Sequence, residues 1–369
     1  MQSFARITAA AAVAAALLSA AAFAQVIPAA GSTRPDDTPS VKLGSTIFAD
    51  YTFNQSPSTT DADGNAIRNS SFNVTRAYIN VLGNLNHYIA FRITPDIVRE
   101  TGGSTGTGSS LAGSYTFRLK YAFGQFNLDD WTTKGSWVRL GLQQTPLVDY
   151  EEGVYRYRFQ GPVFADREGF LTASDSGLAG HWNFPGNYGE VHTGFYNGEG
   201  YSKAETNNEK AFQIRGTVRP LPLGGIWKGL RVTGFLDRDH YLRSAKRTRA
   251  VAQVTFEHPL VNAGFDYLTG KDQTGATKPE VDAIGYSLWV TPRFGKSGWE
   301  MLLRHDQLKP NKAVSQKRTR NIAGVAYWFP NLNKVQSALM VDYDALKQTN
   351  FTPSRAKDTR YGLKLLVNF

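Results

Sequence analysis

Basic residues stand at alternate positions in segments whose remaining positions are apolar. In residues 115–123 the odd positions hold large apolar side chains, and Arg118 and Lys120 stand at even positions. Successive side chains of a β-strand point to opposite faces, so each such segment has one apolar and one basic face. A row of positive charge facing water attracts anions through its field. Anion attraction is therefore the chemistry that this spacing predicts.

Motifs that would indicate an enzyme or a metal site are weak. Residues 102–106 match G-x-S-x-G but lie in the low-complexity run 101–110, which we expect to be an outer loop. Residues 61–65 lack the ligand spacing and closing Glu of a calcium loop and predict a turn. The six histidines show no metal-ligand spacing, and there is no cysteine. We expect no catalytic residue, no cofactor and no metal site.

The basic positions belong to a strand rhythm that runs from Val41 to the C-terminus. Turn residues such as Pro185-Gly186-Asn187 separate sixteen strand-like segments, with fourteen or eighteen as alternative counts. The segments are 41–54, 70–83, 86–97, 113–126, 136–146, 175–184, 188–198, 209–219, 226–238, 247–258, 260–270, 280–293, 298–308, 318–329, 335–347 and 358–369. The last one alternates strictly and ends on Phe369. Short and long connections alternate, as in transmembrane barrels. The predicted fold class is all-β, a transmembrane antiparallel β-barrel.

The N-terminus predicts export. Arg6 precedes an apolar run from Ile7 to Phe23 that ends in Ala22-Phe23-Ala24, so residues 1–24 read as a signal peptide cleaved before Gln25. An uncleaved anchor is the alternative. Residues 25–40 predict a flexible leader, and residues 41–369 the barrel. The predicted location is the bacterial outer membrane.

Composition agrees with a barrel. Hydrophobic residues make up 41% of the chain and mean hydropathy is −0.35, too polar for a helical membrane protein. Transmembrane barrels place their lipid-facing residues at alternate positions, so mean hydropathy stays low. A net charge of +10 would suggest nucleic acid as a partner of a cytosolic protein. Export argues against that reading, and outer-membrane lipid is the expected partner instead.

Face assignment by alternation sends thirteen basic side chains into the barrel lumen. They are Arg76, Arg92, Arg118, Lys120, Arg139, Arg215, Arg219, Arg231, Arg249, Arg293, Arg304, Arg360 and Lys364. The inward acids by the same reading are only Asp266, Glu300, Asp306 and Asp342. The expected lipid face includes Ile89, Phe91, Ile93, Tyr115, Phe117, Leu119, Tyr121, Phe123, Val138, Leu140 and Leu142, with Ala122 inward. Each arginine alone is equally well explained by pairing with a loop carboxylate. As a set they predict a basic lumen that concentrates anions, with Arg92, Arg118, Lys120, Arg139, Arg215 and Arg231 as candidate anion-binding residues.

The alternation stops between Pro146 and Asp175. A connection this long inside a compact protein is usually functional. It combines aromatic residues with charges of both signs, and the candidate constriction residues in it are Glu151, Glu152, Arg156, Arg158, Asp166 and Arg167. We therefore expect this loop to fold into the barrel and narrow it.

Residues 139–146, Glu151-Glu152, residues 166–168 and residues 188–198 together resemble the phosphate-selective porin O and P family. The resemblance implies a sixteen-stranded homotrimeric porin with an inward third loop, and some members of that family carry phosphate or pyrophosphate. It also implies an arginine ladder and a lysine cluster. Arg118, Lys120 and Arg139 match basic wall positions in kind, but a lysine cluster is not evident, and the loop carries more acid than base.

The predicted function is a water-filled channel for small solutes with an anion-preferring lumen. A non-selective diffusion porin is the alternative. An outer-membrane barrel enzyme would need Ser/His or Asp/His pairs on neighbouring strands, and none stands out. A plugged transporter would need a domain of roughly 100 residues before the barrel, and the leader is far shorter.

Overall fold

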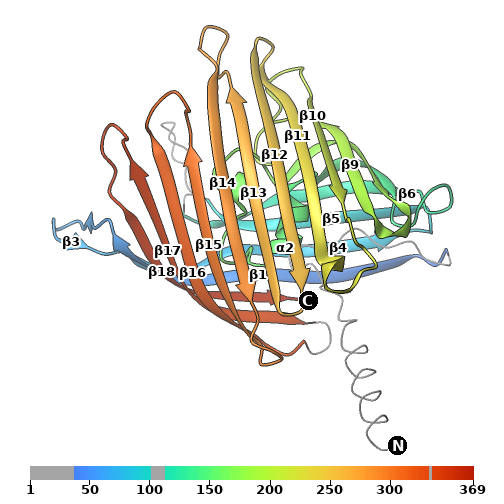
Figure 1. Ribbon diagram of the computed structural model, residues 1–369, viewed down its shortest axis with the longest axis horizontal. Coiled ribbons are helices and arrows are strands. Elements are labelled where there is room, and N and C mark those ends of the chain that lie inside the picture. The colour runs from blue at the N-terminus through green and yellow to red at the C-terminus, as the bar shows by residue number, and fades with distance from the viewer. Residues whose placement is uncertain (1–36, 101–112, 332–334) are drawn as a thin grey trace, which may run out of the picture.

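The computed structural model describes residues 37–100, 113–331 and 335–369. Sixteen strands form one closed antiparallel barrel, each pairing with its neighbours in the sequence (Figure 1). The predicted fold class and strand count are confirmed. The signal peptide, most of the leader and the G-x-S-x-G match lie outside the described residues.

The barrel strands follow the predicted segments closely. Their bounds are β1 Ser40–Ser56, β4 Ser70–Asn84, β5 Ile89–Arg99, β6 Tyr115–Asn127, β7 Trp137–Gln144, β8 Ser174–Asn183, β9 Gly189–Tyr196, β10 Ala211–Val218, β11 Leu230–Leu242, β12 Ala245–His258, β13 Val261–Asp272, β14 Val281–Pro292, β15 Trp299–Lys309, β16 Lys317–Trp328, β17 Gln336–Thr349 and β18 Asp358–Asn368. The start of the predicted segment 226–238 is wrong, because Gly225–Gly229 forms the 3₁₀ helix η3. A second 3₁₀ helix, η2, spans Pro185–Asn187.

The barrel closes through the last strand. Strand β18 pairs with β1 over the register Thr46↔Asn368 to Asn54↔Arg360. Beyond the strand end, Phe369 donates its N–H to the Ser45 carbonyl at 3.0 Å, and Ser45 donates to the Phe369 carbonyl at 3.1 Å. A closed barrel leaves no strand edge with unpaired backbone groups, which a membrane requires.

Deleting Phe369 is expected to reduce the amount of folded protein in the membrane, because it removes both of these closing hydrogen bonds. The measurement is the heat-modifiable band in SDS gels of unboiled membranes. Phe329→Ala, an aromatic change in a turn, serves as the control and should leave that band unchanged. Normal levels of folded protein after the deletion would contradict this role of Phe369.

The longest connections, among them those after β1, β7 and β9, lie at one end of the barrel, and most connections at the other end are shorter. The end with the β7–β8 connection also holds the small hairpin of β2 (Thr59–Thr60) and β3 (Ala66–Ile67). Between β2 and β3, Asp61 accepts backbone N–H groups from Asp63 and Asn65, which forms a turn as predicted. The opposite end holds the C-terminus and turns as short as residues 259–260 (Figure 1). Transmembrane barrels place their longer loops outside, so we refer to these ends as outer and periplasmic.

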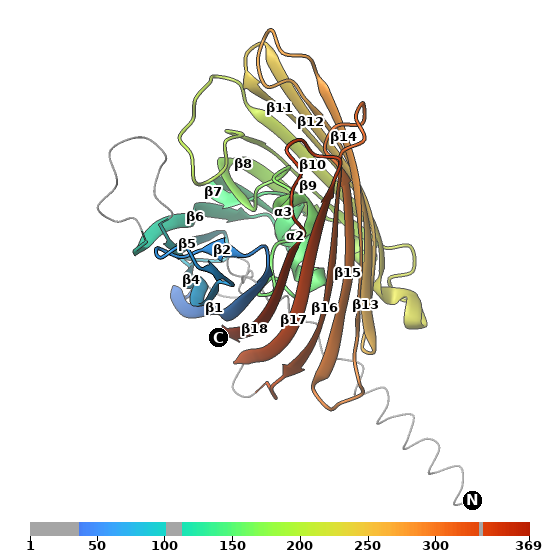
Figure 2. The same ribbon diagram turned by 90° about the vertical axis from the view of Figure 1, so that its left-hand side faces the viewer.

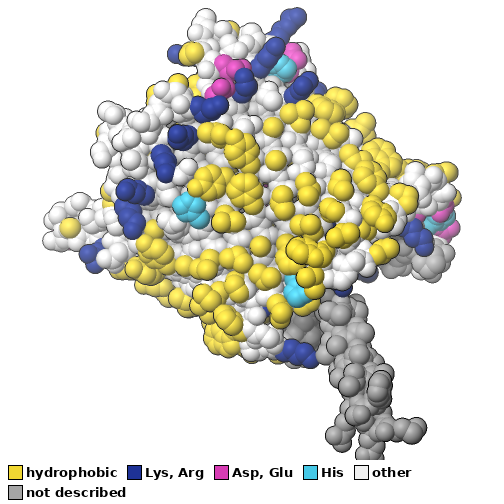
Figure 3. All heavy atoms as spheres, in the orientation of Figure 1, with side chains coloured by type: hydrophobic (Ala, Val, Ile, Leu, Met, Phe, Trp, Pro, Cys, Tyr) yellow, Lys and Arg dark blue, Asp and Glu magenta, His cyan; other side chains and the backbone are white. Residues whose placement is uncertain are grey.

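The outward wall is apolar over most of its height. Leu140, Leu178, Phe195 and Leu288 are each more than half exposed there. Figure 3 shows hydrophobic side chains spread as a broad band over this wall. A soluble protein rarely exposes so large an apolar surface, whereas a lipid bilayer requires it. No helix among the described residues is long and apolar enough to cross a membrane.

The predicted faces of strand β6 are wrong in its second half. The β5–β6 register shifts between Thr94↔Tyr121 and Pro95↔Leu119, so Lys120 is an extra residue in a bulge. A bulge reverses the facing of every later residue relative to the earlier ones. Tyr121 and Phe123 are therefore buried on the inward side, where guanidinium groups cover both rings, and Ala122 faces outward.

The described end of the leader lies against a periplasmic turn. Asp37 accepts the backbone N–H of His87 and also contacts its imidazole, whose other nitrogen is 3.2 Å from Asp130. The hydrogen bond to Asp37 raises the pKa of His87 above its ordinary value. This contact is therefore strongest where His87 is protonated and Asp37 is ionised, and it weakens as pH rises through the pKa of His87. It ties the leader to the β4–β5 and β6–β7 turns.

Candidate constriction and lumen

The β7–β8 connection, residues 145–173, folds into the barrel, and we call it L3. It contains helices α2 (Val148–Tyr155) and α3 (Phe164–Arg167), which the sequence did not predict. Figure 2 shows both helices enclosed by the strands. Helix α2 ends at Tyr155, and its C-cap residue Arg156 has a left-handed φ of 66°. That conformation costs about 1–2 kcal/mol for a residue with a side chain, and it turns the chain toward the opposite wall.

An apolar cluster inside the lumen holds L3. Tyr155 and Tyr157 are fully buried, and the Tyr155 ring packs edge-on against Trp289 at 5.3 Å between centroids. Tyr157 packs similarly against Trp328 at 5.8 Å. The wall side of this cluster consists of inward apolar residues: Phe48, Tyr78, Tyr121, Phe123, Trp289, Leu302, Ile322, Ala326, Trp328, Ala338, Met340 and Leu366. Alternation indicated a basic lumen and did not reveal this cluster, two of whose residues, Tyr121 and Phe123, it assigned to the lipid face.

Ion pairs and hydrogen bonds fix the far side of L3. Glu300 on β15 accepts the Tyr157 hydroxyl at 3.1 Å and pairs with Arg156 at 3.2 Å and with Arg293 at 3.1 Å. Its side chain is 8% exposed. Two guanidinium groups and one hydroxyl surround this buried carboxylate, which therefore anchors L3. Loss of the carboxylate would leave two arginines without their partner.

Replacing Glu300 with Ala is expected to loosen L3. Removing one member of a buried ion pair costs about 3–5 kcal/mol when the partner charge stays behind. The barrel wall keeps its backbone ladder, so the result should be a folded channel with noisier current rather than loss of the barrel. Single-channel recording tests this expectation, and Glu280→Ala, at an exposed site, is the control. Unchanged current noise in Glu300→Ala would argue against the anchor.

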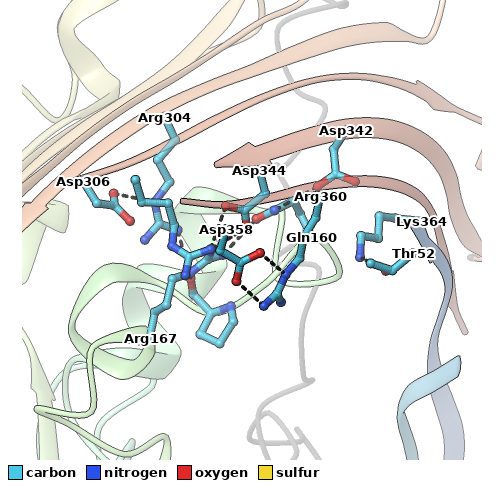
Figure 4. A network of polar contacts seen from close by, with 12 residues as sticks. Thr52, Gln160, Arg167, Arg304, Asp306, Asp342, Asp344, Asp358, Arg360 and Lys364 are labelled. Carbon is cyan, nitrogen blue, oxygen red and sulfur yellow. Dashed lines mark hydrogen bonds and ion pairs between the residues drawn. The ribbon is translucent and has the colours of Figure 1, made fainter. Parts of the chain in front are cut away.

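A second set of contacts fixes L3 to β16–β18 nearer the outer end (Figure 4). Arg167 lies 3.3 Å from Asp344, which also pairs with Arg320 at 2.7 Å. Gln160 donates to Asp342 at 3.0 Å. On the same wall Lys364 pairs with Asp50 at 2.8 Å, and Arg360 pairs with Asp358. Charges of both signs therefore stand close together on this side of the lumen.

The structure places all thirteen predicted basic residues on the inward side, but with many more acids than expected. Besides the four predicted acids, the lumen receives Asp50, Asp96, Glu190, Asp237, Asp239, Glu257, Asp272 and Asp344. The count of four acids is therefore wrong. A guanidinium in a partly dry lumen needs a carboxylate nearby, and the neighbouring strands supply one. The face assignment missed Asp344 and Asp272, although each shares its strand and phase with a predicted acid, Asp342 and Asp266 respectively. It also missed the basic residues Arg247, Arg318 and Arg320, which pair with Asp239, Glu168 and Asp344.

The six candidate anion-binding residues differ in accessibility. Arg92, Lys120 and Arg139 are buried, and Lys120 donates to the Tyr78 hydroxyl at 3.2 Å. Arg139 donates to Gln125 and Gln144 and lies over the Trp137 ring. The other three form ion pairs with carboxylates: Arg118 with Asp96, Arg215 with Glu190, and Arg231 with Glu257.

The six candidate constriction residues lie in or beside the two L3 helices. Arg158 pairs with Glu152 at 2.5 Å and approaches Asp166 at 4.0 Å, so these three residues hold L3 to itself. Glu151 is buried on α2, and Arg156 and Arg167 make the wall contacts already described. L3 therefore folds inward with these residues, as predicted, and they contact both other residues of L3 and the wall.

Cavities lie on both sides of L3. On the outer side, adjoining cavities of about 510 and 430 Å³ share Asp50, Asn73 and residues 160–162 of L3. On the periplasmic side, a cavity of about 510 Å³ extends from Pro146 on L3 to Arg231 on β11. Trp137, His181 and His192 from adjacent strands also line it, and the two imidazoles lie 6.1 Å apart. No group of three or more His, Asp or Glu among the described residues is arranged to hold a metal ion.

These features define a class of protein. The chain is an outer-membrane β-barrel with the porin fold: sixteen antiparallel strands, an apolar outer wall, a charged lumen and a loop folded inside. Such closed barrels are the β-architecture that spans a membrane, because every backbone polar group is paired within the wall. The predicted outer-membrane location follows from this fold.

Solved structures share this fold. An anion-selective porin from Comamonas acidovorans aligns with a TM-score of 0.61 at 11% identity, covering 90% of this chain and 100% of that one. The trimer form of OmpT, an outer membrane protein of Vibrio cholerae, aligns with a TM-score of 0.59 at 12% identity over 90% and 100%. The outer membrane channel DcaP of Acinetobacter baumannii gives 0.57 at 10% identity over 92% and 100%. No family model matches the sequence, and no curated protein matches it.

Proposed function

We propose that this chain is a diffusion porin that lets small solutes cross the outer membrane, with a modest preference for anions. The observation that carries the proposal is the charge around the cavities on either side of L3. Among the described residues, the outer cavities are lined by Arg76, Arg99, Arg158, Arg167, Arg320, Arg360 and Lys364 against Asp50, Asp342 and Asp344. The periplasmic cavity is lined by Arg139, Arg215, Arg219 and Arg231 against Asp149, Glu190 and Glu257.

An excess of positive charge in a narrow aqueous space raises the local concentration of anions. Because most cations also contact a carboxylate, the excess at each point is small, and a modest preference is the expected consequence. Phosphate is a candidate solute on the resemblance to the phosphate-selective porin O and P family, together with other small anions. A non-selective diffusion porin is the second candidate, and the extensive ion pairing favours it.

The proposal is a channel and not an enzyme. Most of the inward ion pairs hold L3 or join neighbouring strands, which is a structural use of charge. The Vibrio cholerae protein described in a trimer form supports a homotrimer as the proposed assembly.

Liposome swelling tests the channel directly. Liposomes with the purified, folded protein should swell at rates that fall steeply with solute size, because L3 narrows the passage. Protein denatured before reconstitution is the control and should give no swelling. Absence of swelling with the folded protein for every small sugar or salt would reject the diffusion porin.

A further inference from the structure

The outward wall of β14–β17 carries an apolar groove. Its volume is about 340 Å³, and Leu288, Leu303 and Ala323 line it. Ala323 on β16 pairs directly with Leu303 on one side and with Tyr343 on the other. A small side chain between two large ones leaves a hollow in the wall, and this hollow faces the lipid.

Three polar residues line this groove beside its apolar residues. His305 on β15 and Asn321 on β16 form its edge toward the outer loops, and Tyr343 on β17 flanks it beside Ala323. The His305 ring lies 2.7 Å from the Asn321 side-chain oxygen. Polar side chains on an outward wall are tolerated where the apolar core of a bilayer gives way to its headgroups. The groove therefore ends close to the level of the outer headgroups.

Three lysines stand above that edge, and we call them the basic row: Lys309, Lys317 and Lys347. Each is four residues from a groove residue on its own strand, so it shares the outward face and lies about 13 Å further toward the outer loops. No hydrogen bond or ion pair joins their side chains to another part of the described structure. Figure 3 shows Lys and Arg side chains in a line beyond the apolar band.

The basic row differs from the charge in the lumen. In the lumen most cations are arginines that meet carboxylates, as a planar guanidinium favours. The row consists of lysines, whose flexible stems can extend along apolar surface while the ammonium reaches headgroups. At the periplasmic edge, the outward positions of the described strands hold no Lys or Arg, and aromatic pairs such as Trp299 and Tyr327 stand there instead.

We propose that this wall binds a phosphate-bearing glycolipid of the outer leaflet. One acyl chain lies in the groove beside Ala323, and headgroup phosphates meet Lys309, Lys317 and Lys347. Charge complementarity, the one-sided position of the row and the groove directly beneath it all fit this occupant. A solute in the lumen does not reach these residues, so the site is independent of the proposed channel.

Binding of fluorescent diphosphoryl lipid A to the full-length protein in detergent micelles tests the site. K309E/K317E/K347E removes the row, and A323F fills the groove without changing charge. The matched control is K134E/K228E/K296E, which changes three exposed lysines in periplasmic turns by the same amount. We expect the row variant to weaken binding by about tenfold or more. A323F should weaken it several-fold, and the control should change it by less than about twofold.

Two further binding measurements separate the contribution of the lipid's phosphates from the contribution of the groove. The same lipid without phosphates should bind the wild type about tenfold or more weakly than diphosphoryl lipid A does, and the row variant should bind it no more weakly than the wild type does. Excess inorganic phosphate should not displace the lipid, because the groove contributes to binding. Equal losses in the row and control variants, or binding that ignores the phosphates, would overturn the proposal. Heat modifiability shows that each variant is folded, and conductance should be unchanged in all of them.

Discussion

Replacing residues 147–171 with a Gly-Ser-Gly turn is expected to raise single-channel conductance by roughly twofold or more, since a channel's narrowest part limits its current. L3 lies between the outer cavities and the periplasmic cavity and separates them. Strands β7 and β8 are antiparallel neighbours, with Gln144 opposite Ser174, so a short turn can join them. Removing L3 would merge the cavities into one wide passage.

The barrel should survive this replacement. Its wall is held by backbone hydrogen bonds between strands, and L3 contributes none to the strand ladder. Stability should still fall, because Trp289 and Trp328 would lose their buried partners Tyr155 and Tyr157. Deleting residues 274–279, an outer connection between β13 and β14, is the control and should leave conductance nearly unchanged. A loopless barrel with wild-type conductance would show that L3 does not limit the passage.

The second prediction concerns the charges of the outer cavities. R320Q/R360Q/K364Q removes three positive charges from one wall of that space, and D50N/D342N/D344N removes three negative charges from the same wall. The first variant should lower the ratio of anion to cation permeability by about twofold or more, and the second should raise it, because each alters the local potential in proportion to charge. Both sets replace charged groups by neutral amides, and the Asp→Asn changes also keep the size of the side chain.

Salt concentration provides an internal check on this prediction. The Debye length falls from about 10 Å at 0.1 M to about 3 Å at 1 M, so both shifts should shrink at high salt. Shifts in the same direction for the two variants would mean that shape, and not charge, determines selectivity. The reversal potential in a KCl gradient is the measurement for both variants.

The strand plan could be predicted from the sequence because two strong local signals agree. Apolar side chains recur with period two, and turn residues interrupt them at regular intervals. The inward placement of Arg118 and Lys364 follows from the same pattern, since a charge in the middle of a lipid-facing wall costs about 2–4 kcal/mol. These constraints act within single strands, so one sequence is enough to predict where the strands lie and which way their side chains face.

Features that depend on two or more strands could not be read in this way. The bulge at Lys120 arises from the register between β5 and β6, and it turned Tyr121 and Phe123 inward. The many lumen carboxylates are placed by ion pairs between strands, such as Arg231 with Glu257. In the sequence, aromatic residues on the inward face look like ordinary strand residues, because their burial depends on L3 folding over them. Helix α2 is short and takes its stability from packing, not from helix propensity.

The pairing of lumen charges also determines how strong a preference to expect. Arg118 is bound to Asp96 at 2.9 Å, and the buried Lys120 donates to a tyrosine hydroxyl, so neither acts as an isolated charge on passing ions. Net charge near the cavities, and not the number of arginines, should set the potential. This distinguishes a mildly selective channel from one built around a single strong anion site.

One measurement tests the central claim most directly: the reversal potential of the wild-type protein in a planar bilayer under a KCl gradient. The account predicts stepwise conductance increases on insertion and a reversal potential of the sign that chloride preference gives. Its magnitude should be well below the limit for a purely chloride-permeable channel, and it should fall as salt rises. A cation-preferring reversal potential, or a folded protein that produces no conductance at all, would contradict the account.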